Sequence, residues 1–488
     1  MLFNSFEFLL FFPAVLAVYY AAPRVTRIFV LLVASYAFYM AWRPELILLI
    51  AGSTLVDYVA ARNIGATESR SRRRAWLTLS LSVNLGLLFL FKYAGFATRE
   101  ANELLEALGV AGRVPVLDLP LPVGISFYTF QTLSYTINVF FRRATVERNA
   151  GAFALYVAYF PQLVAGPIER SGRLLPQLKD LPPLDAQRCV SGLRLALWGM
   201  FKKVVIADRL AVLVDLVYGS PGAYTDEALG LATIFFAFQI YCDFSGYSDI
   251  AIGISRVIGV DLMTNFRRPY LALGVRDFWR RWHISLSTWF RDYLYIPLGG
   301  SQLPLVRWAL VVLFVFLVSG LWHGANWTFV VWGGIHGTLL VLEGLVGDRA
   351  RTWAEKLPMA GGLLRGLMRP ATFLVVLVAW VFFRAESVSD GFLIVERMAH
   401  VPYEALLGEG ASLAWLETDA KRLGLAGFEL GLAVVAILGL VAAELVRELR
   451  GRPWNPPTWL QWSADYAGLL GILVLGRFSE NAFIYFQF

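Results

Sequence analysis

The stretch Leu-Trp-His-Gly-Ala-Asn-Trp-Thr-Phe, residues 321–329, places an ionisable imidazole inside the long apolar segment 308–345. Apolar runs of this kind favour helices that cross a bilayer. An ionisable side chain at that depth is expensive to keep, which marks His323 as a functional candidate. Gly320 and Gly324 loosen the helix around it. Because interrupted helix at membrane depth is tolerated only where it is buried or lines a cavity, we expect a cavity at this point.

The composition excludes a soluble globular protein. Of the 488 residues, 58% are hydrophobic and 16% are charged, whereas soluble domains carry roughly 25% charged residues. Repeated apolar runs predict a polytopic α-helical membrane protein. The net charge of +7 is not interpreted as a nucleic-acid signal, because most arginines lie in short clusters between apolar runs. Cys189 and Cys242 suggest neither a disulfide framework nor a metal cluster.

The arginine clusters also predict an orientation. The first expected spans are residues 8–22, 28–41, 46–61 and 76–92. The connection 62–74 carries five arginines against one glutamate, so it is predicted to be cytoplasmic. Alternation then places the N-terminus on the extracytoplasmic side. The first 20 residues have no basic leader, so they are expected to form a spanning helix and not a cleaved signal peptide.

Two later stretches do not suit a straight span. Residues 119–131 and 159–170 combine prolines and a glycine with aromatic side chains. Such residues leave backbone groups unpaired by helix, and these groups must be buried in protein or line a cavity. Re-entrant or kinked segments are therefore expected there.

Helices are expected over residues 190–214 and 229–256, and the second has a polar centre. At 100° per residue, Gln239 and Asp243 share one face, and Ser245 and Asp249 share nearly the opposite one. A helix that is polar on two sides cannot face lipid, so we predict it inside the bundle, with Asp243 as a supporting residue of the site. The alternative is that these side chains only join helices, at about 0.6 kcal/mol per hydrogen bond.

Residues 265–300 are the most basic part of the chain, with tryptophans between the arginines. This pattern is typical of an interfacial helix. It also suits a pocket for a phosphorylated ligand, because guanidinium pairs bidentately with phosphate. Lipid headgroups offer the same anion, so both interpretations stay open. The candidate donor-binding residues are Arg267, Arg268, Arg280, Arg281 and Arg291.

The remaining histidines are interpreted more simply. His336 is expected to pack among small residues at a helix crossing. His400 is expected to lie exposed in an extramembrane loop over residues 385–429. A metal site made of His283, His323 and His336 is not favoured, because their spacing is unlike any standard zinc motif.

Several motifs together resemble the membrane-bound O-acyltransferase superfamily, and within it the bacterial branch of alginate O-acetyltransferase-like proteins. They follow the family order from about residue 120 to the last residue. The matching segments are 121–131, 160–168, 241–249, 280–287, 292–300, 321–327, 380–385 and 483–488. One departure is Asn138, where similar proteins commonly carry aspartate. If that carboxylate orders the cavity wall or meets the acceptor, the resemblance does not determine the acceptor of this chain.

The resemblance implies one membrane domain over residues 1–488, an all-α polytopic bundle of about 11 to 13 transmembrane helices with broken segments around a funnel or tunnel. It makes His323 essential and places His283 near it. It also implies cytosolic acetyl-CoA as co-substrate, with no bound cofactor. The acetyl group would cross the bacterial inner membrane to a polysaccharide, through a periplasmic partner acetyltransferase of the SGNH-hydrolase type. Membrane lipids are expected around the bundle and nucleic acid is not an expected partner.

The chemistry can be argued from the residues. Moving acetyl from a thioester to an oxygen needs a base, and imidazole, with an ordinary pKa near 6.5, can take the hydroxyl proton. We assign this role to His323, with His283 orienting it or polarising the thioester carbonyl. Asn326, three residues on, is expected to reach the same face and donate a hydrogen bond. The rings of Trp322 and Trp327 are expected to keep water out.

Two other functions remain as alternatives. A transporter would also need polar residues within the membrane, but no inverted repeat is visible in the sequence. Transfer of another acyl group, such as D-alanyl to a wall polymer, would use the same kind of site. Alginate, cellulose and peptidoglycan are all possible acetyl acceptors, and the chain does not choose between them.

Overall fold

The computed structural model describes the chain except for residues 165, 356–357, 408–426, 452–455, 479–482 and 485–488, with the backbone alone for 347–355, 358–365, 401–407 and 427. Its regular elements are helices, with no strand in the described part, which confirms the all-α prediction. The chain divides into two compact units, Met1–Ala196 with Tyr247–Thr264, and Leu197–Gly246 with Asn265–Phe488.

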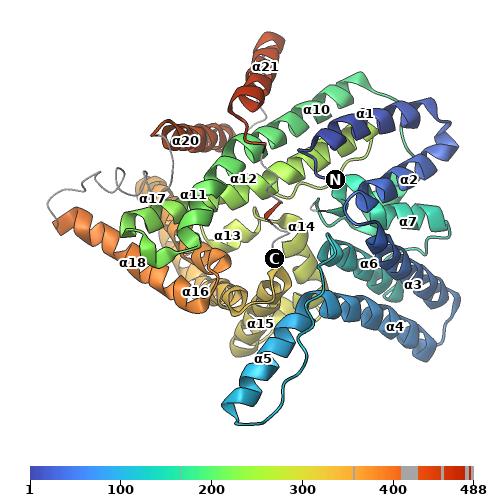
Figure 1. Cartoon of the computed structure of the whole chain (residues 1–488), viewed down its shortest axis with the longest axis horizontal. Coiled ribbons are helices and arrows are strands. Elements are labelled where there is room, and N and C mark those ends of the chain that lie inside the picture. The colour runs from blue at the N-terminus through green and yellow to red at the C-terminus, as the bar shows by residue number, and fades with distance from the viewer. Residues whose placement is uncertain (165, 356–357, 408–426, 452–455, 479–482, 485–488) are drawn as a thin grey trace. The chain divides into compact units, whose positions relative to one another are not determined.

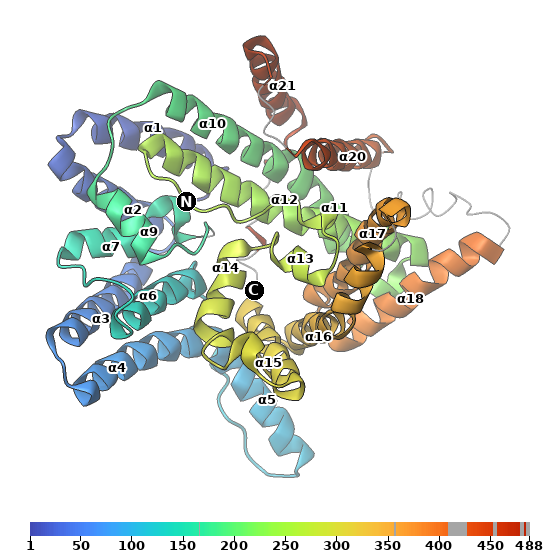
Figure 2. The ribbon, with the colours of Figure 1, turned by 180° about the vertical axis from the view of Figure 1, so that it is seen from behind.

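The first unit contains the N-terminal helices (Figure 1). They are α1 (Phe6–Ala21), α2 (Arg27–Met40), α3 (Ile47–Ala66), α4 (Arg70–Leu88), α5 (Ala94–Ala107), α6 (Ile125–Phe140), α7 (Ala150–Ala158), α8 (Phe160–Leu163) and α9 (Ser171–Lys179). The first four correspond to the four spans expected from the sequence. A π-helical stretch, Phe89–Tyr93, joins α4 to α5, and α5 extends past the other helices of this unit in Figures 1 and 2.

The helix α10 (Ala186–Phe201) leads into the second unit. Except for residues 247–258 at the end of α12, which belong to the first unit, the second unit holds the other helices. These are the π-helix η4 (Lys202–Ala207), α11 (Asp208–Tyr218), α12 (Asp226–Ile258), α13 (Val275–Trp279), α14 (Ile284–Phe290), α15 (Leu305–His323), α16 (Trp327–Glu355), α17 (Pro358–Arg384), α18 (Val388–Leu407), α20 (Gly427–Arg450) and α21 (Thr458–Leu475). The predicted helix over 229–256 corresponds to α12, most of which is buried as expected.

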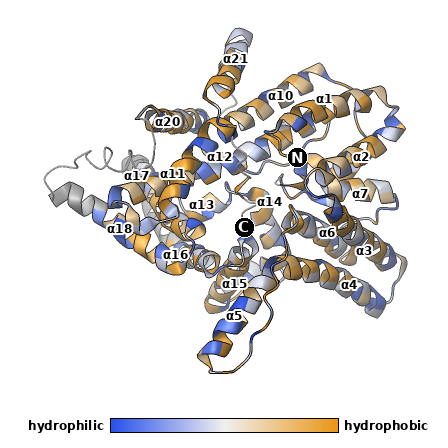
Figure 3. Ribbon diagram, viewed as in Figure 1, coloured by the Kyte–Doolittle hydropathy of each residue, from blue (hydrophilic) through white to orange (hydrophobic). Residues whose placement is uncertain are grey.

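Seven helices in the described part are long and apolar enough to cross a membrane. Several helices expected to span are shorter, such as α1 with 16 residues and α2 with 14. Figure 3 shows apolar residues along most helices, with hydrophilic patches on α5 and α18. The chain is therefore an all-α polytopic membrane protein.

Close packing of α15 against α16 positions the central histidine. The two helices run antiparallel, joined by the turn at 324–326. A Cβ added at Gly320 would collide with the backbone carbonyl of Phe329, and one added at Gly333 would collide with that of Phe316. Glycine is therefore required at both positions, since small residues let membrane helices approach closely.

Three expectations about local structure need correction. Residues 119–131 do not form a kinked helix, because the prolines precede α6, which then runs without interruption from Ile125. Residues 388–407 form α18, so the expected loop over 385–429 is partly helical, and 408–426 lie outside the described residues. The helix expected over 190–214 contains the π-helical stretch η4. By contrast, 159–170 is broken as expected, since only the four-residue α8 is helical there.

Candidate active site

His323 is the last residue of α15 and lies inside the second unit. It is 3% exposed, and the chain leaves the helix directly after it through Gly324, whose backbone is extended. A Cβ at position 324 would collide with the ring of Phe329. The glycine therefore lets the chain turn sharply beneath the imidazole, and the histidine sits at the carbonyl end of its helix.

Aromatic rings surround the His323 imidazole. Trp322, Trp332 and Phe383 each meet it edge to face, with centroids 4.9, 5.0 and 5.2 Å away. Trp332 comes from α16 and Phe383 from α17, so three successive helices build this enclosure. Edge-to-face contact of this kind is the arrangement that aromatic pairs prefer. The enclosure keeps water away from the imidazole.

His283 precedes α14 and is fully buried. Its backbone is left-handed, with φ of 43°, an uncommon conformation for a residue with a side chain that calls for local support. Its Nδ1 lies 3.2 Å from Oδ1 of Asn265. Because an amide oxygen only accepts, Nδ1 carries the proton and Nε2 the lone pair. Burial lowers the pKa of His283 to about 3, so this ring is neutral at cellular pH.

The structure brings three histidines into one aromatic cluster. Trp322 contacts both His283 and His323, with centroids at 6.1 and 4.9 Å. Trp332 likewise contacts both His323 and His336, at 5.0 and 4.9 Å. A tryptophan thus lies between each neighbouring pair of imidazoles. Among the described residues, no group of three or more His, Cys, Asp or Glu is arranged to hold a metal ion.

Asn326 and Trp327 do not lie where helical spacing suggested. Because α15 ends at His323, Asn326 belongs to the turn, where its amide donates to the carbonyl of Glu386 (3.1 Å) and its oxygen accepts from the N–H of Thr328 (3.0 Å). Asn326 therefore secures the start of α16. Trp327 is 52% exposed, so it does not cover the imidazole.

Asp243 is buried in an ion-pair network. Its carboxylate lies 2.7 Å from Nζ of Lys203 and accepts from the N–H of Ile484 (2.8 Å). Lys203 also pairs with Asp208 at 2.9 Å. A buried charge needs such partners. Asp243 thus connects α12 to η4 and to the end of the described chain, and four of the last six family-motif residues, 485–488, lie outside the described part.

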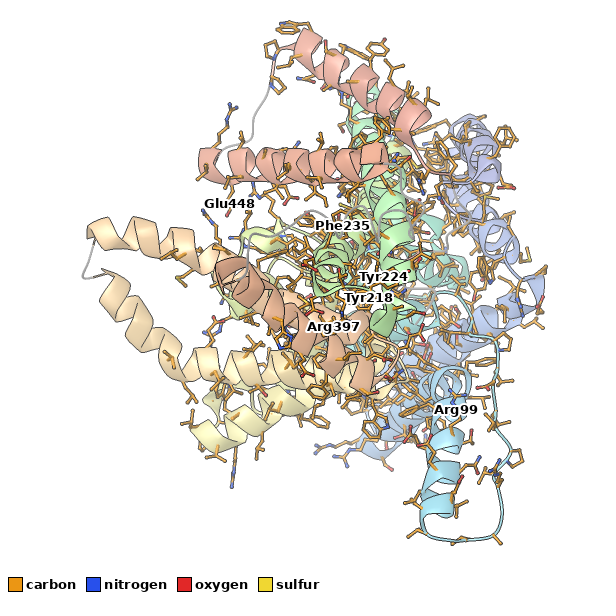
Figure 4. The ribbon with its side chains drawn as sticks, turned by 60° about the vertical axis from the view of Figure 1, so that its left-hand side comes forward. Arg99, Tyr218, Tyr224, Phe235, Arg397 and Glu448 are labelled. Carbon is orange, nitrogen blue, oxygen red and sulfur yellow. The ribbon has the colours of Figure 1, made fainter. Side chains whose placement is uncertain are left out.

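The predicted donor-binding arginines separate into two groups. Arg268 and Arg281 both pair with Glu448 of α20, at 2.9 and 3.0 Å. Figure 4 labels Glu448 beside this helix. Arg281 also pairs with Asp277 at 3.0 Å, so two carboxylates balance the two guanidinium groups within the protein. Arg267 donates its backbone N–H to the carbonyl of Arg281 and its side chain is exposed.

Arg280 and Arg291 line a pocket of about 860 Å³, together with Arg276. Arg291 also pairs with Asp292 at 2.8 Å, but this pair is largely exposed, unlike the pairs of Glu448. This volume lies in the range of small-molecule sites, which is roughly 300–1,000 Å³. Hydroxyl groups and apolar side chains complete the wall. The other lining residues are Trp279, Ile284, Leu286, Ser287, Thr288, Phe290, Tyr295, Ser301, Leu303, Leu305, Trp308, Val312, Val315, Phe316, Ser319, Leu340 and Gly344.

The pocket reaches close to His323. Ser319, one of its lining residues, lies four positions before His323 on α15, which places both on the same face of the helix. Trp279, another lining residue, contacts the enclosure through Trp332, with centroids 5.7 Å apart. The pocket therefore joins a basic region to the neighbourhood of the buried imidazole.

Sequence reasoning missed several of these residues. Arg276 lies within the basic stretch and was passed over because no phosphate motif singles it out. Phe383 lies in the matching segment 380–385 but was not singled out there. Trp332 and Trp279 carry no local signal, since each meets its partner only when distant helices pack together.

Comparison with known proteins identifies the family of the chain. Residues 147–376 match the family model described as MBOAT, membrane-bound O-acyltransferase family. The chain is 39% identical over 442 residues to the probable alginate O-acetylase AlgI of Pseudomonas aeruginosa, covering 90% of this chain and 81% of that protein. It is 33% identical over 434 residues to the peptidoglycan O-acetyltransferase of Helicobacter pylori, covering 84% and 79%.

A more distant likeness is to the teichoic acid D-alanyltransferase of Streptococcus thermophilus, with 27% identity over 239 residues, covering 45% of this chain and 56% of that protein. The first two relatives are similar over most of their length and their names state acyl transfer to an oxygen. On sequence and fold together, the chain belongs to the membrane-bound O-acyltransferase family and is an O-acyltransferase.

Proposed function

We propose that the protein transfers acetyl from acetyl-CoA, across the bacterial inner membrane, to a hydroxyl group of an extracytoplasmic polysaccharide such as alginate. The observation that carries this proposal is the pocket that begins at arginines and ends one helical turn from His323. The names of the similar proteins, alginate O-acetylase and peptidoglycan O-acetyltransferase, support acetyl as the group and a polymer as the acceptor.

The pocket suits a coenzyme A thioester. The guanidinium groups of Arg276, Arg280 and Arg291 would bind the phosphates, and the apolar wall between them and Ser319 would contact the pantetheine arm. Ion pairing withholds Arg268 and Arg281 from this role. The donor would thus present its thioester at the deep end of the pocket, nearest the imidazole.

His323 would act as the general base. It takes the proton of the acceptor hydroxyl as that oxygen attacks the thioester carbonyl, so that the C–O bond forms, the C–S bond breaks and the proton passes to the leaving thiolate. The carbonyl end of α15 favours the imidazolium that exists between these steps. The neutral His283, held by Asn265, would polarise the carbonyl or orient His323.

The chemistry of the reaction supports the proposed polysaccharide acceptor and the proposed periplasmic partner. Acetyl delivered to a polymer outside the membrane needs a route across it, and we propose that a periplasmic acetyltransferase of the SGNH-hydrolase type receives the group. The arginine-rich connection 62–74, between α3 and α4, supports a cytoplasmic location for this connection and an extracytoplasmic N-terminus.

The test is a His323→Ala variant in purified membranes supplied with acetyl-CoA. Acetyl transfer should fall about a thousandfold or more, because the base is lost, while expression and thermal unfolding stay close to wild type. His400→Ala is the matched control, since His400 is 58% exposed and pairs with Asp226 on another part of the unit. Persisting transfer in the His323 variant would disprove the base assignment.

A second acyl group is favoured by one observation, the partial likeness to a teichoic acid D-alanyltransferase. Supplying the membranes either with acetyl-CoA or with a D-alanyl thioester on a carrier protein separates the two. Labelling from acetyl-CoA alone supports the acetyl proposal. Labelling from the D-alanyl thioester alone would overturn it, and flux of an unmodified solute without any acyl transfer would favour a transporter.

A further inference from the structure

We propose that Trp279 sets the length of the acyl group that reaches His323, and that His336 is the positioning residue that holds Trp279 in place. This inference rests on the proposed function and names a residue that governs specificity at the same site. It begins from the position of Trp279, which is both a wall of the donor pocket and a neighbour of the His323 enclosure.

Trp279 lies between the donor pocket and the aromatic rings that enclose His323. On one side its ring lines the pocket next to Phe316, with centroids 5.2 Å apart. On the other side it meets Trp332, which in turn contacts His323. Trp279 is 8% exposed and Trp332 is fully buried. A donor thioester at the deep end of the pocket therefore points its acyl group at the indole rings of Trp279 and Trp332.

The indole of Trp279 is held in place by His336. Its Nε1–H donates to Nδ1 of His336 at 3.4 Å, and the two rings meet edge to face with centroids 5.1 Å apart. Because Nδ1 accepts, the proton of His336 sits on Nε2. His336 lies on α16, about one turn of helix after Trp332. His336 thus fixes both the orientation and the position of the Trp279 ring.

The two indole rings limit the space that is open to the acyl group beyond the thioester carbonyl. Phe383, Trp332 and Trp322 already fill the surroundings of His323, and Trp279 closes the remaining side toward the pocket. A two-carbon acyl group needs little room past the carbonyl, whereas each added methylene must displace an aromatic ring. Discrimination of about tenfold per methylene or more is what an apolar pocket supplies.

Trp308 provides a matched control. It lines the same pocket, and its Nε1–H donates to the hydroxyl of Tyr295 at 3.0 Å. It lies near the start of α15, four turns of helix from His323. Replacing Trp308 therefore enlarges the pocket by the same chemistry without opening it toward the imidazole.

The experiment measures binding and turnover of acetyl-CoA and butyryl-CoA by the full-length protein in nanodiscs, for wild type, Trp279→Ala and Trp308→Ala. The ratio of butyryl to acetyl kcat/KM should rise at least about tenfold in Trp279→Ala and stay within about threefold of wild type in Trp308→Ala. An equal rise in both variants, or an unchanged ratio in Trp279→Ala with acetyl turnover retained, overturns the proposal.

Further variants guard against loss of folding and test the positioning residue. Trp279→Phe keeps an aromatic ring and should shift the ratio in the same direction by a smaller factor. His336→Phe removes the acceptor and should raise the ratio, whereas His336→Gln, whose Oε1 can accept from the indole, should restore it. A shift in neither histidine variant overturns the role of His336.

The experiment distinguishes failure of the donor assignment from failure of the acyl-length proposal. If wild type binds no acetyl-CoA, the donor assignment itself is wrong, and the length proposal falls with it. If wild type binds and consumes acetyl-CoA while Trp279→Ala keeps the wild-type ratio, only the length proposal is wrong.

Discussion

At the scale of single residues, burial determines the charge that a side chain can carry. Glu169 is fully buried in the broken stretch between α8 and α9, where it accepts from the N–H of Met263 and lies 3.9 Å from Arg173. Burial raises the pKa of this carboxyl to about 7, and the hydrogen bond and Arg173 oppose the rise only in part. The folded protein therefore holds a proton that the unfolded chain releases near pH 4.5.

This difference predicts a pH dependence of stability. Because the folded pKa of Glu169 lies above the unfolded one, its contribution is fully present below about pH 4.5 and is lost as the pH rises through 7, a loss of about 3 kcal/mol. The thermal unfolding midpoint of the solubilised protein should accordingly fall between pH 5 and pH 8. Glu169→Gln, which keeps the acceptor for Met263, should flatten that dependence and unfold at a higher temperature than wild type at pH 8. An identical pH profile for the two proteins would contradict the prediction.

At the scale of the elements, the α15–α16 pair shows how closely two helices must approach to place the site. Gly333 faces the backbone of Phe316, whereas a Cβ at the adjacent Gly334 would meet only the methyl end of Leu317 at 3.7 Å. The first contact is with rigid backbone and the second is ordinary van der Waals contact. The same sequence pair, Gly-Gly, thus contains one required glycine and one replaceable one.

Gly333→Ala should therefore push α15 and α16 apart and destabilise the protein by about 1–3 kcal/mol, the usual effect of overpacking. Activity should fall as well, since His323 and Trp332 lie on the two helices. Gly334→Ala should be neutral or slightly stabilising, because alanine is the better helix former. Thermal unfolding and acetyl transfer of the two variants, measured side by side, check this. Equal behaviour of the two would show that the helices are not in the contact described.

The elements were largely predictable from the sequence. Apolar runs and arginine clusters are local signals, so α1 to α4 and α12 emerged where expected. Residues 388–407 were assigned to a loop because their polarity outweighed helix propensity in the prediction, yet an amphipathic helix needs only one apolar face. Asn326 was misplaced for the opposite reason, since the helical spacing was extended past the residue at which α15 ends.

At the scale of the whole molecule, the burial of the central histidine could be predicted from the sequence, whereas the side chains that surround it could not. The burial of His323 follows from the sequence around it, and His283 was linked to it by resemblance. That Trp322 and Trp332 lie between the imidazoles depends on how α14, α15 and α16 pack. Likewise, nothing local separates Arg280, which lines the pocket, from Arg281, which is neutralised by Glu448 of a helix much later in the chain.

One long helix leads to a prediction about the proposed orientation of the molecule. Arg70–Ala107 is helical over 38 residues, about 57 Å at 1.5 Å per residue, whereas the hydrocarbon core is about 30 Å thick. The helix begins in the arginine-rich connection that we assign to the cytoplasm. Its second half, α5, must then emerge on the extracytoplasmic side.

Single cysteines in a variant without Cys189 and Cys242 test this orientation with a membrane-impermeant maleimide on intact spheroplasts. A cysteine at Glu103, exposed on α5, should be labelled from outside, as should one at Glu7 near the N-terminus. A cysteine at Ser71, exposed at the start of α4, should react only after the membrane is permeabilised. The physical reason is that the membrane field and the translocation machinery retain clustered arginines on the inside. Labelling of position 71 alone in intact cells would invert the topology and, with it, the side from which acetyl-CoA must enter.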